Sequence, residues 1–425
     1  MKATIPAPVA GITRGIVRPR SPSQDSTNIT FSKAARIQEA ETIDKSHPSS
    51  STDILSSIPM PNINSPYRQS TYSMPKEIGC FSYGVDRIAQ MQSRESLRYY
   101  HPPNKNVSLS AGYPDKYITR DKKPEHLDAL LDCMKDINTR RVGNDQAPII
   151  PNFCTWRGIM SKIIRVPYAS KESWELGVTL HKGTIYMEEH ESEEKQSSKF
   201  GSSDKDMLFT YWGYKFETLS TIPIPPRKLI PHDPHLLERE TETVNTNVQF
   251  CSVFASQYGP HDIVLGGEVD CLTREVSPGE LPQSAYAELK TNRVIETDRQ
   301  RHTFEKFKLL RIWEQSFLAG VPKVIIGFRT DGGEISHVHE FDTAELPRIV
   351  RNKPGMWDPN RCVSFGDSVL TWIKSIVTID DSDTVYTICF SSEKRRIEIL
   401  APVKGGPNVF IPENFVLDPT SSSAT

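Results

Sequence analysis

The 425-residue sequence predicts an α+β fold, in which a single domain of mixed β-sheets is flanked by helices. Short apolar segments bounded by turn residues alternate with segments of helical periodicity across residues 75–411. No structureless stretch in that range is long enough to divide it. Residues 1–74 are instead rich in Ser, Pro, Thr, Asn and Gln. We therefore predict disordered tails over residues 1–74 and 412–425, with one folded domain between them.

The composition narrows the range of functions. The formal net charge is −2, so any contact with nucleic acid must come from a local basic surface rather than a global field. The seven cysteines are an odd number without a Cys-x-x-Cys pair, which predicts reduced thiols in a cytosolic or nuclear protein and no zinc site. No apolar run approaches the ~20 residues that cross a bilayer, and the N-terminus lacks an apolar signal segment. Neither a membrane span nor secretion is expected.

Three segments show the apolar spacing of helices. They cover residues 125–142, 302–319 and 367–377, the last with Asp367 as its N-cap. The apolar stripe of the second helix consists of Phe304, Phe307, Leu310, Trp313 and Phe317. Its polar face carries Lys308, Arg311 and Gln315. This polar face would either meet water or face a bound phosphate.

Ten segments have the composition and length of strands. They cover residues 153–158, 180–188, 207–216, 248–253, 263–271, 284–291, 324–329, 335–341, 384–390 and 396–400. The second and third of these segments flank a polar, acidic run, and we predict that they form a β-hairpin with a long loop. Asp331-Gly332-Gly333 predicts a tight turn in a second hairpin.

The stretch from Gly266 to Lys290 concentrates the residues that can carry chemistry. Glu268 and Asp270 alternate with apolar residues at its start, and Glu288 and Lys290 do so at its end. Alternate residues of a strand point to one face, so neighbouring strands would bring three carboxylates and one ammonium together. Crowded carboxylates repel each other unless a hard cation such as Mg²⁺ or Mn²⁺ lies between them. The lysine would then hold a phosphate oxygen or an attacking water.

Each half of this stretch alone is also typical of a solvent-exposed strand. Together they form the pattern Asp-x17-Glu-x-Lys from Asp270 to Lys290, which is the spacing of the PD-(D/E)XK nuclease core. The pattern therefore indicates a metal-dependent nuclease core within the predicted α+β domain.

Seven motifs follow one another along the chain in the order of a known family. They are Thr155–Gly158, Gly183–Glu188, Tyr211–Glu217, Gly267–Asp270, Glu288–Lys290, Trp313–Ser316 and Gly327–Arg329. On these motifs the chain resembles the DXO/Rai family of RNA 5′-end decapping nucleases. The resemblance is strongest to the fungal nuclear members, which partner a 5′→3′ exoribonuclease of the Rat/Xrn type. It covers roughly residues 75–400 and leaves every acidic position of the family's active-site pattern intact.

The resemblance implies a divalent metal cation, Mg or Mn, as the cofactor. The implied metal ligands are Glu188, Glu268, Asp270, Glu288 and the carbonyl oxygen of Leu289. The implied catalytic residues are Glu188, Glu268, Asp270, Glu288, Lys290 and Gln315. Of these, Lys290 and Gln315 would hold the attacking water or the scissile phosphate. Two metal ions together can neutralise phosphoryl oxygens, activate water and stabilise the leaving oxygen.

The resemblance also implies a set of substrate-binding residues. They are Glu125, Trp156, Arg157, Gly158, Cys251, Glu268, Lys290 and Gln315, with Arg87 a weaker match. An arginine such as Arg157 suits bidentate contact with an RNA phosphate. Three structural alternatives stay open at this point: a surface salt bridge for Arg157, a packed core thiol for Cys251 and a solvated helix face for Gln315.

The resemblance finally implies an activity and a location. The protein is expected to hydrolyse incomplete or non-standard RNA caps (unmethylated guanosine, NAD) and 5′-triphosphate ends in the nucleus, and to stimulate a nuclear 5′→3′ exoribonuclease. One alternative is a mainly non-catalytic role as a stabilising subunit of that exoribonuclease. A DNA nuclease with the same core is another, because a fold alone does not choose the substrate.

Overall fold

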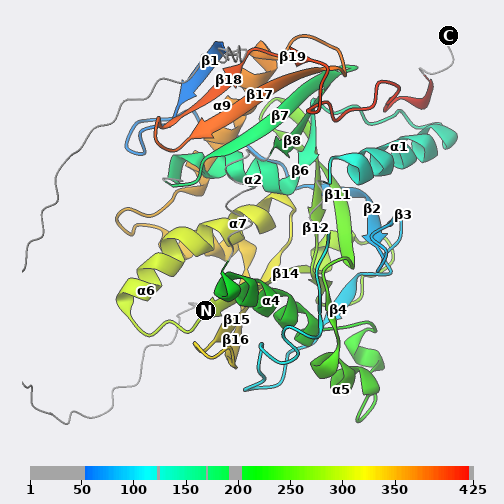
Figure 1. The fold of residues 1–425 in the computed structure, drawn as a ribbon, viewed down its shortest axis with the longest axis vertical. Helices are drawn as coiled ribbons and strands as arrows, with labels where there is room; N and C mark the ends of the chain where they lie inside the picture. Colours follow the sequence, from blue (N-terminus) through cyan, green and yellow to red (C-terminus); the bar gives the residue numbers. More distant parts are fainter. Residues whose placement is uncertain (1–52, 122–124, 169–170, 191–202, 421–425) are drawn as a thin grey trace, which may run out of the picture. The chain divides into compact units, whose positions relative to one another are not determined.

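A computed structural model describes residues 53–121, 125–168, 171–190 and 203–420. The larger sheet within these residues has eleven strands, and Figure 1 shows most of them in its upper part. In sheet order they are β1 (Ile54–Pro59), β18 (Arg396–Leu400), β17 (Thr384–Ser391), β7 (Trp174–His181), β8 (Thr184–His190), β6 (Phe153–Trp156), β12 (His261–Glu268), β11 (Gln249–Tyr258), β2 (Lys76–Tyr83) and β3 (Ala89–Met91), with β19 (Val403–Lys404) paired to β17.

A second sheet contains six of the described strands. In order they are β16 (Ile335–Asp342), β15 (Lys323–Arg329), β14 (Tyr286–Arg293), β13 (Cys271–Leu272), β4 (Arg98–Tyr100) and β9 (Thr221–Ile222). β14 and β15 run parallel, whereas β15 and β16 form an antiparallel hairpin. A separate parallel pair joins β10 (Val244–Asn245) to β5 (Tyr117–Ile118). Apart from 180–188 and 207–216, the predicted strands are confirmed, with shifts of a few residues at their ends.

The described helices pack in layers with the two sheets. They are α1 (Asp128–Gly143), α2 (Arg157–Arg165), α4 (Asp204–Leu219), α5 (Pro234–Thr241), α6 (Asp298–Thr303), the π-helical segment η4 (Phe304–Lys308), α7 (Leu309–Leu318), α8 (Leu346–Val350) and α9 (Pro359–Ile376). α2 and α7 lie between the sheets (Figure 1), where Ile163 and Trp313 belong to the largest apolar core. α1 covers the outer face of the larger sheet through Met134, and α4 covers that of the smaller sheet through Phe216. The predicted α+β class is thereby confirmed.

The chain crosses from one sheet to the other immediately after β12. β12 ends at Glu268 in the larger sheet, and β13 begins at Cys271 in the smaller one. Val269, between them, is buried in a small apolar core with Phe250 and Tyr286. The two sheets therefore meet at the acidic stretch.

Residues 207–216 form part of a helix, so the predicted strand is wrong. α4 begins after Ser203, whose hydroxyl accepts a hydrogen bond from the Asp206 N–H while the Asp206 side chain accepts one in return. This reciprocal cap stabilises the first turn. Trp212 and Phe216, four residues apart, are buried against the smaller sheet. The aromatic composition that suggested a strand instead fills one face of a helix.

Residues 180–188 contain a turn, so the prediction of one continuous strand is also wrong. β7 and β8 meet at Lys182 and Gly183, which have φ values of 47° and 80°. Two consecutive residues with positive φ make the tight turn of a β-hairpin. The hairpin is therefore β7–β8 and does not involve residues 207–216. Residues 191–202 of the predicted loop lie outside the described residues.

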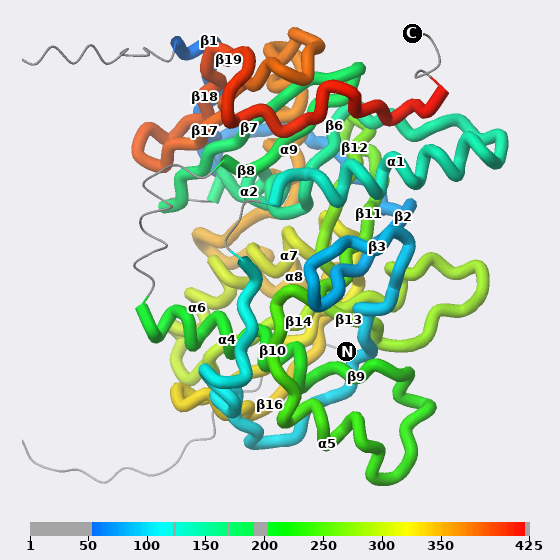
Figure 2. Tube along the Cα trace, turned by 45° about the vertical axis from the view of Figure 1, so that its right-hand side comes forward, coloured from blue at the N-terminus to red at the C-terminus, as the bar shows by residue number. Residues whose placement is uncertain are grey.

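Both predicted domain boundaries lie inside the described fold. β1 pairs with β18 and adds a strand to the larger sheet before residue 75. At the other end, Phe415 and Leu417 are buried in the core beside α1, and Figure 2 shows the red C-terminal segment passing along α1. The remaining parts of the predicted tails, residues 1–52 and 421–425, lie outside the described residues.

The long helix predicted over residues 302–319 is confirmed as a continuous run of α6, η4 and α7. The π-helical turn shifts the register, so Phe307 is 46% exposed instead of joining the predicted apolar stripe. The helix predicted over residues 367–377 is the second half of α9. Asp358, rather than Asp367, is its N-cap, because the Asp358 side chain accepts a hydrogen bond from the Asn360 N–H.

The seven cysteines are free thiols, as predicted. Six of them are buried, and Cys389 is partly exposed. Within the described part of the chain, no helix is both long enough and apolar enough to span a bilayer.

Candidate active site

The predicted convergence of acidic residues occurs where the two sheets meet. Glu268 ends β12, Asp270 lies in the short link to β13, and Glu288 belongs to β14. Asp270 Oδ2 accepts a hydrogen bond of 2.6 Å from the Leu289 N–H, which ties the link to β14. The acidic residues are therefore brought together by a chain that changes sheet, and not by two neighbouring strands of one sheet.

Glu288 lies between two cationic side chains. It is 2% exposed, and its Oε1 is 2.6 Å from Lys290 Nζ. Its Oε2 accepts a hydrogen bond of 3.2 Å from Arg157 Nη1. Lys290 Nζ also lies 3.8 Å from Asp270 Oδ2. The structure thus brings four of the predicted site residues into one connected group.

Arg157 reaches Glu288 because two glycines precede Glu268. Arg157 starts α2 directly after β6, and β6 runs parallel to β12. A Cβ on Gly266 would lie 2.7 Å from the Trp156 ring, and one on Gly267 would lie 3.3 Å from the Arg157 side chain. Glycine therefore allows the start of α2 to pack closely against β12. Because Arg157 is buried, at 9% exposure, the alternative of a surface salt bridge is excluded.

The three carboxylates titrate differently because their surroundings differ. Burial raises the pKa of Asp270 from 3.8 to about 7, and the negative charge of Glu288 adds to the rise. Burial would also raise the pKa of Glu288, but Lys290 and Arg157 outweigh it and lower that pKa to about 2. Burial raises the pKa of Glu268, although Lys290 acts in the opposite direction. Lys290 and Arg157 therefore neutralise mainly Glu288, and Glu268 and Asp270 lack a full counter-charge.

Glu217 on α4 joins these carboxylates, although the sequence pattern did not predict it. Burial, followed by the charges of Asp270 and Glu268, raises the pKa of Glu217 well above its usual range. Glu217 and Tyr214 line a cavity of about 150 Å³ together with Glu268 and Asp270. The signal was the three-residue spacing of Tyr214 and Glu217, which puts both on one face only in a helix. We call Glu217, Glu268, Asp270 and Glu288 the acidic cluster.

Glu188 lies on β8, and β6 is the one strand between β8 and β12 in the sheet. It is 4% exposed, and its Oε1 lies 2.9 Å from His126 Nδ1 and 3.1 Å from His190 Nε2. Within the described residues, no hydrogen bond or ion pair joins Glu188 to the acidic cluster. The two histidines were not predicted from the sequence. The participation of Glu188 in a shared metal site stays a prediction.

Two further predicted residues are Cys251, which lies beside the acidic cluster, and Gln315, which lies on α7. Cys251 on β11 pairs in register with Glu268 on β12 and is 5% exposed. Burial raises the pKa of the Cys251 thiol, which fits the alternative of a packed core thiol. Gln315 is half-buried on α7, and no hydrogen bond within the described residues holds its side chain. Contact of either residue with substrate stays a prediction.

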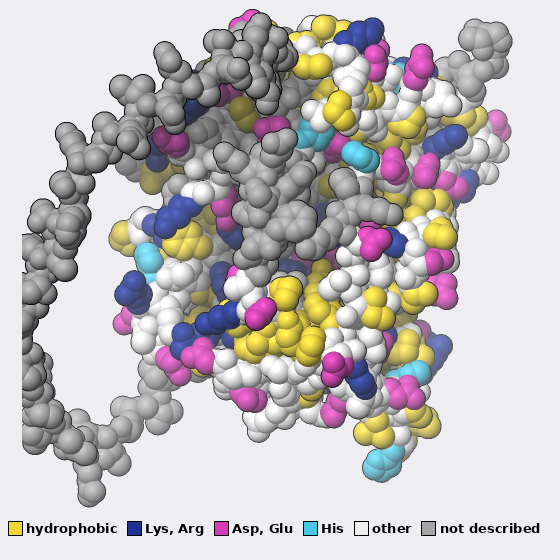
Figure 3. All heavy atoms as spheres, in the orientation of Figure 1, with side chains coloured by type: hydrophobic (Ala, Val, Ile, Leu, Met, Phe, Trp, Pro, Cys, Tyr) yellow, Lys and Arg dark blue, Asp and Glu magenta, His cyan; other side chains and the backbone are white. Residues whose placement is uncertain are grey.

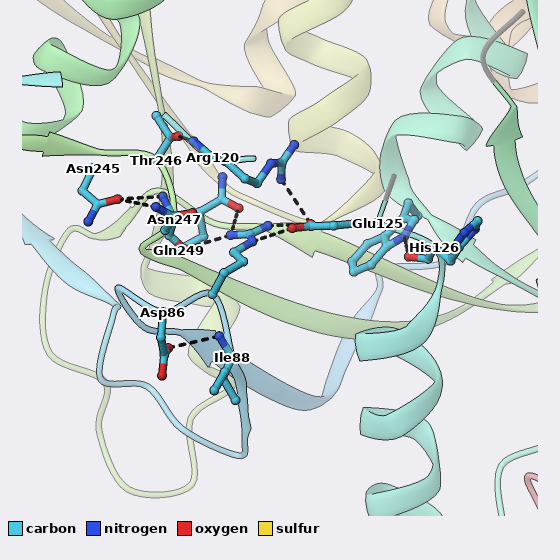
Figure 4. A network of polar contacts seen from close by, with 11 residues as sticks. Asp86, Ile88, Arg120, Glu125, His126, Asn245, Thr246, Asn247 and Gln249 are labelled. Atoms are coloured by element: carbon cyan, nitrogen blue, oxygen red, sulfur yellow. Dashed lines mark hydrogen bonds and ion pairs between the residues drawn. The ribbon is translucent and has the colours of Figure 1, made fainter. Parts of the chain in front are cut away.

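Glu125 anchors a separate charged network (Figure 4). Its carboxylate accepts two hydrogen bonds of 2.8 Å from Arg87 and one of 3.3 Å from Arg120. The hydrogen bond from Arg87 is the main reason that the pKa of Glu125 is lowered. The next residue, His126, accepts at its carbonyl a 3.4 Å hydrogen bond from Trp156 Nε1. The predicted substrate residues Glu125 and Trp156 are therefore connected, whereas Gly158 stands exposed in the first turn of α2.

The acidic cluster has the chemistry of a divalent-metal site. Carboxylate oxygens are the ligands that Mg²⁺ and Mn²⁺ prefer in proteins. Burial and the charge of Glu288 raise the pKa of Asp270, and a bound divalent cation would instead favour its ionised form. Across the described chain, no three His, Cys, Asp or Glu side chains already converge as ligands, and Glu288 is engaged by Lys290 and Arg157 instead. The donor set nevertheless fits a divalent cation held by Glu268, Asp270 and Glu288.

The mixed-sheet core, the acidic cluster and the adjacent lysine define a nuclease of the PD-(D/E)XK class. A family model described as "RAI1 like PD-(D/E)XK nuclease" matches residues 73–416. The chain belongs to this family and is therefore a hydrolase. The resemblance drawn from the seven motifs is confirmed.

The relatives agree with this assignment. The chain is 35% identical to the decapping nuclease RAI1 of Neurospora crassa over 352 residues, which are 80% of this chain and 82% of the relative. It is 34% identical to the decapping and exoribonuclease protein of Homo sapiens over 351 residues, 81% and 85% of the two chains. The structure of Scheffersomyces stipitis Rai1 with (3′-NADP)+ and a calcium ion aligns with a TM-score of 0.72 at 25% identity, over 83% of this chain and 96% of that chain. The chain is thus a hydrolase of the decapping-nuclease type.

Proposed function

We propose that this protein is a metal-dependent nuclease that removes incomplete or non-standard caps, including unmethylated guanosine and NAD caps, and triphosphates from RNA 5′ ends. The observation that carries the proposal is the acidic cluster with Lys290 and Arg157 in a chain of this family. The names of the relatives support RNA caps as the substrate. The Rai1 structure with (3′-NADP)+ and calcium supports a dinucleotide and a divalent cation as ligands.

The chain's own residues divide the work of hydrolysis between them. Glu268, Asp270 and Glu288 would hold a divalent cation, which supplies Lewis-acid stabilisation and an activated water. Arg157 and Lys290, which both contact Glu288, would supply positive charge to the reacting phosphate, where negative charge increases in the transition state. Glu288 fixes both cations in place through its two oxygens. Because Arg157 is buried, its charge acts on a phosphoryl oxygen with little screening by water.

Asp270→Asn tests the catalytic role. The substitution should reduce release of the triphosphate, the unmethylated guanosine cap and the NAD cap together, by at least about 100-fold, because one carboxylate set serves all three reactions. The three RNAs would be incubated with Mg²⁺ or Mn²⁺ and the released groups quantified by chromatography. Asp262→Asn is the matched control, because Asp262 is an exposed carboxylate at the other end of β12. If the wild-type protein releases none of the three groups, the proposal fails.

We further propose that the protein acts in the nucleus and stimulates a 5′→3′ exoribonuclease of the Rat/Xrn type. The support is the similarity to the fungal RAI1 proteins. Docking of a partner does not require the acidic cluster, so Asp270→Asn should stimulate the exoribonuclease as well as the wild-type protein does. Loss of stimulation in every preparation, or a cytoplasmic distribution of the tagged protein, would contradict this part of the proposal. A wild-type protein that stimulates but hydrolyses no cap would favour the mainly non-catalytic role.

A further inference from the structure

Three cationic side chains gather at the carboxyl ends of β14 and β15. Arg293 and Arg329 are the last residues of these parallel strands and are direct neighbours in register. Lys308, at the end of η4, donates a hydrogen bond of 2.9 Å from its Nζ to Asn292 Oδ1. We call Arg293, Lys308 and Arg329 the basic cluster. The carboxyl ends of parallel strands are where ligands bind in many α/β folds.

The basic cluster has too little negative charge of its own. Among the described residues, Asp331 is the one carboxylate paired with it, through a 2.6 Å ion pair to Arg293. Lys308 is bonded to a neutral amide, and partial burial together with the charge of Arg329 lowers the pKa of Lys308. Like charges on neighbouring strands destabilise a sheet. A bound anionic ligand would reduce the repulsion between Arg293 and Arg329.

An aromatic surface adjoins these cations. The Arg329 guanidinium lies 4.4 Å from the centre of the Trp212 ring and 4.9 Å from that of Phe209. Trp212 is buried, whereas Phe209 is 39% exposed. Figure 3 shows hydrophobic side chains gathered over α4, with Lys and Arg side chains along their edge. Cations beside an exposed aromatic ring are typical of surfaces that bind single-stranded nucleic acid, where phosphates meet the charges and bases stack on the ring.

Lys308 links the basic cluster to the acidic cluster along β14, whereas Arg293 and its register neighbour Arg329 occupy alternate positions and extend from the other face of the sheet. Asn292 is two residues beyond Lys290, so both side chains point to the same face of the strand about 7 Å apart. Lys308 therefore continues a row that starts with Glu288 and Lys290. A polynucleotide held with one phosphate at Lys290 would have a neighbouring phosphate within reach of Lys308.

We propose that Lys308, Arg329 and Arg293 bind backbone phosphates of the RNA chain beside the scissile phosphate. The inference rests on the proposed RNA substrate and adds a second contact region to it. The basic cluster would hold the body of the RNA while the acidic cluster acts on its 5′ end. An acidic protein partner is the competing occupant, and the exposed Phe209 ring beside Arg329 favours RNA over it.

Binding of single-stranded RNA tests this role without catalysis. The ligand is a 5′-phosphorylated oligouridine of about 20 nucleotides, with the full-length protein in chelator over a series of KCl concentrations. Lys308→Gln and Arg329→Gln should each weaken binding and reduce the slope of log K against log [KCl] by about 0.7, the value of one lost phosphate contact on a single strand. Arg348→Gln on α8, where the side chain is 66% exposed, is the matched control and should leave the slope unchanged. Lys308→Arg should restore it.

Substrate length provides the second readout. With Mn²⁺, Lys308→Gln should raise KM for a capped RNA of about 20 nucleotides. It should leave kcat and KM for a capped mononucleotide unchanged, because that substrate has no backbone phosphate beyond the cap to meet Lys308. An unchanged salt slope, or equal losses on both substrates, would overturn the inference. So would unchanged RNA binding with loss of exoribonuclease co-purification, which would make this surface a protein interface. Wild-type protein that binds RNA through these residues but removes no cap would refute the proposed function alone.

Discussion

Glu288 and Glu188 are both buried glutamates that contact two nitrogen-bearing side chains, yet the chemistry of those partners differs. The partners of Glu288 are Lys290 and Arg157, which stay positively charged across the physiological pH range. The partners of Glu188 are two imidazole rings, His126 through Nδ1 at 2.9 Å and His190 through Nε2 at 3.1 Å. Glu288 is therefore a counter-ion that two permanent cations require. Glu188 instead lies between two imidazole nitrogens.

The contrast concerns the partners that each glutamate has in this structure, and a shared metal site for the two stays a prediction. Both glutamates were predicted as ligands of one metal centre. The structure places Glu288 at the junction of the two sheets and places Glu188 beyond β6, in contact with other partners. Substitutions at the two positions should therefore differ in their effect on stability.

The largest expected difference is in folding stability. Glu288→Gln leaves Arg157 and Lys290 without their counter-ion, and because Arg157 is buried the unpaired charge should destabilise the metal-free protein by about 3 kcal/mol. Glu188→Gln keeps a side chain that can still accept a hydrogen bond, so its loss should be about 1 kcal/mol. Urea unfolding in chelator measures both. Equal losses of unfolding free energy for the two variants would show that water solvates Arg157 and Lys290 when the charge of Glu288 is removed.

The next expected effect is on the pH dependence of stability. Because the pKa of Asp270 is raised from 3.8 to about 7 in the folded protein, the folded state holds this proton more tightly than the unfolded state. The resulting stabilisation is complete below about pH 4 and is lost as the pH rises through 7. In chelator, wild-type protein should therefore lose stability relative to Asp270→Asn between pH 5 and 8, by on the order of 2 kcal/mol.

Added Mn²⁺ provides the control for this pH effect. A cation that binds the ionised carboxylates should reverse the loss in the wild-type protein and have less effect in Asp270→Asn. Melting temperatures across the pH series, with and without the metal, measure both changes. A wild-type curve parallel to that of Asp270→Asn at all pH values would show that Asp270 is not the group that holds the proton.

The smallest expected effect is in the network around Glu125. Glu125→Gln removes the ion pairs with Arg87 and Arg120, but these groups are partly exposed and screened by water. Arg87 also keeps its hydrogen bonds to the Asn247 carbonyl and to Gln249. The loss of unfolding free energy should stay below about 1 kcal/mol. If Glu125→Gln lost as much unfolding free energy as Glu288→Gln, the ion pairs of Glu125 would contribute to stability as strongly as those of Glu288.

Some predictions failed because local composition and tertiary packing point in different directions. The aromatic residues of 207–216 favour a strand by propensity, but a reciprocal cap at Ser203 and Asp206 starts a helix whose apolar face packs on the smaller sheet. That error also hid Glu217. In the helix predicted over residues 302–319, the π-helical segment η4 moved Phe307 from the predicted apolar stripe to the surface, a change that apolar spacing does not reveal.

The sequence by itself determined the α+β class, the family and most of the central site. Alternation along a strand fixes which residues share a face. The side chains of Glu288 and Lys290, two residues apart, must therefore lie on the same face of their strand. Only the tertiary structure decided that the link after β12 crosses between two sheets, that α4 adds Glu217 and that β6 separates Glu188 from the acidic cluster. These outcomes depend on which strands become neighbours, and that choice is made by burial of apolar faces over the whole domain rather than by any short stretch of residues. The stretch from Gly266 to Lys290 therefore supplies the carboxylates and the lysine. The tertiary packing determines which other side chains, such as Arg157 and Glu217, lie beside them.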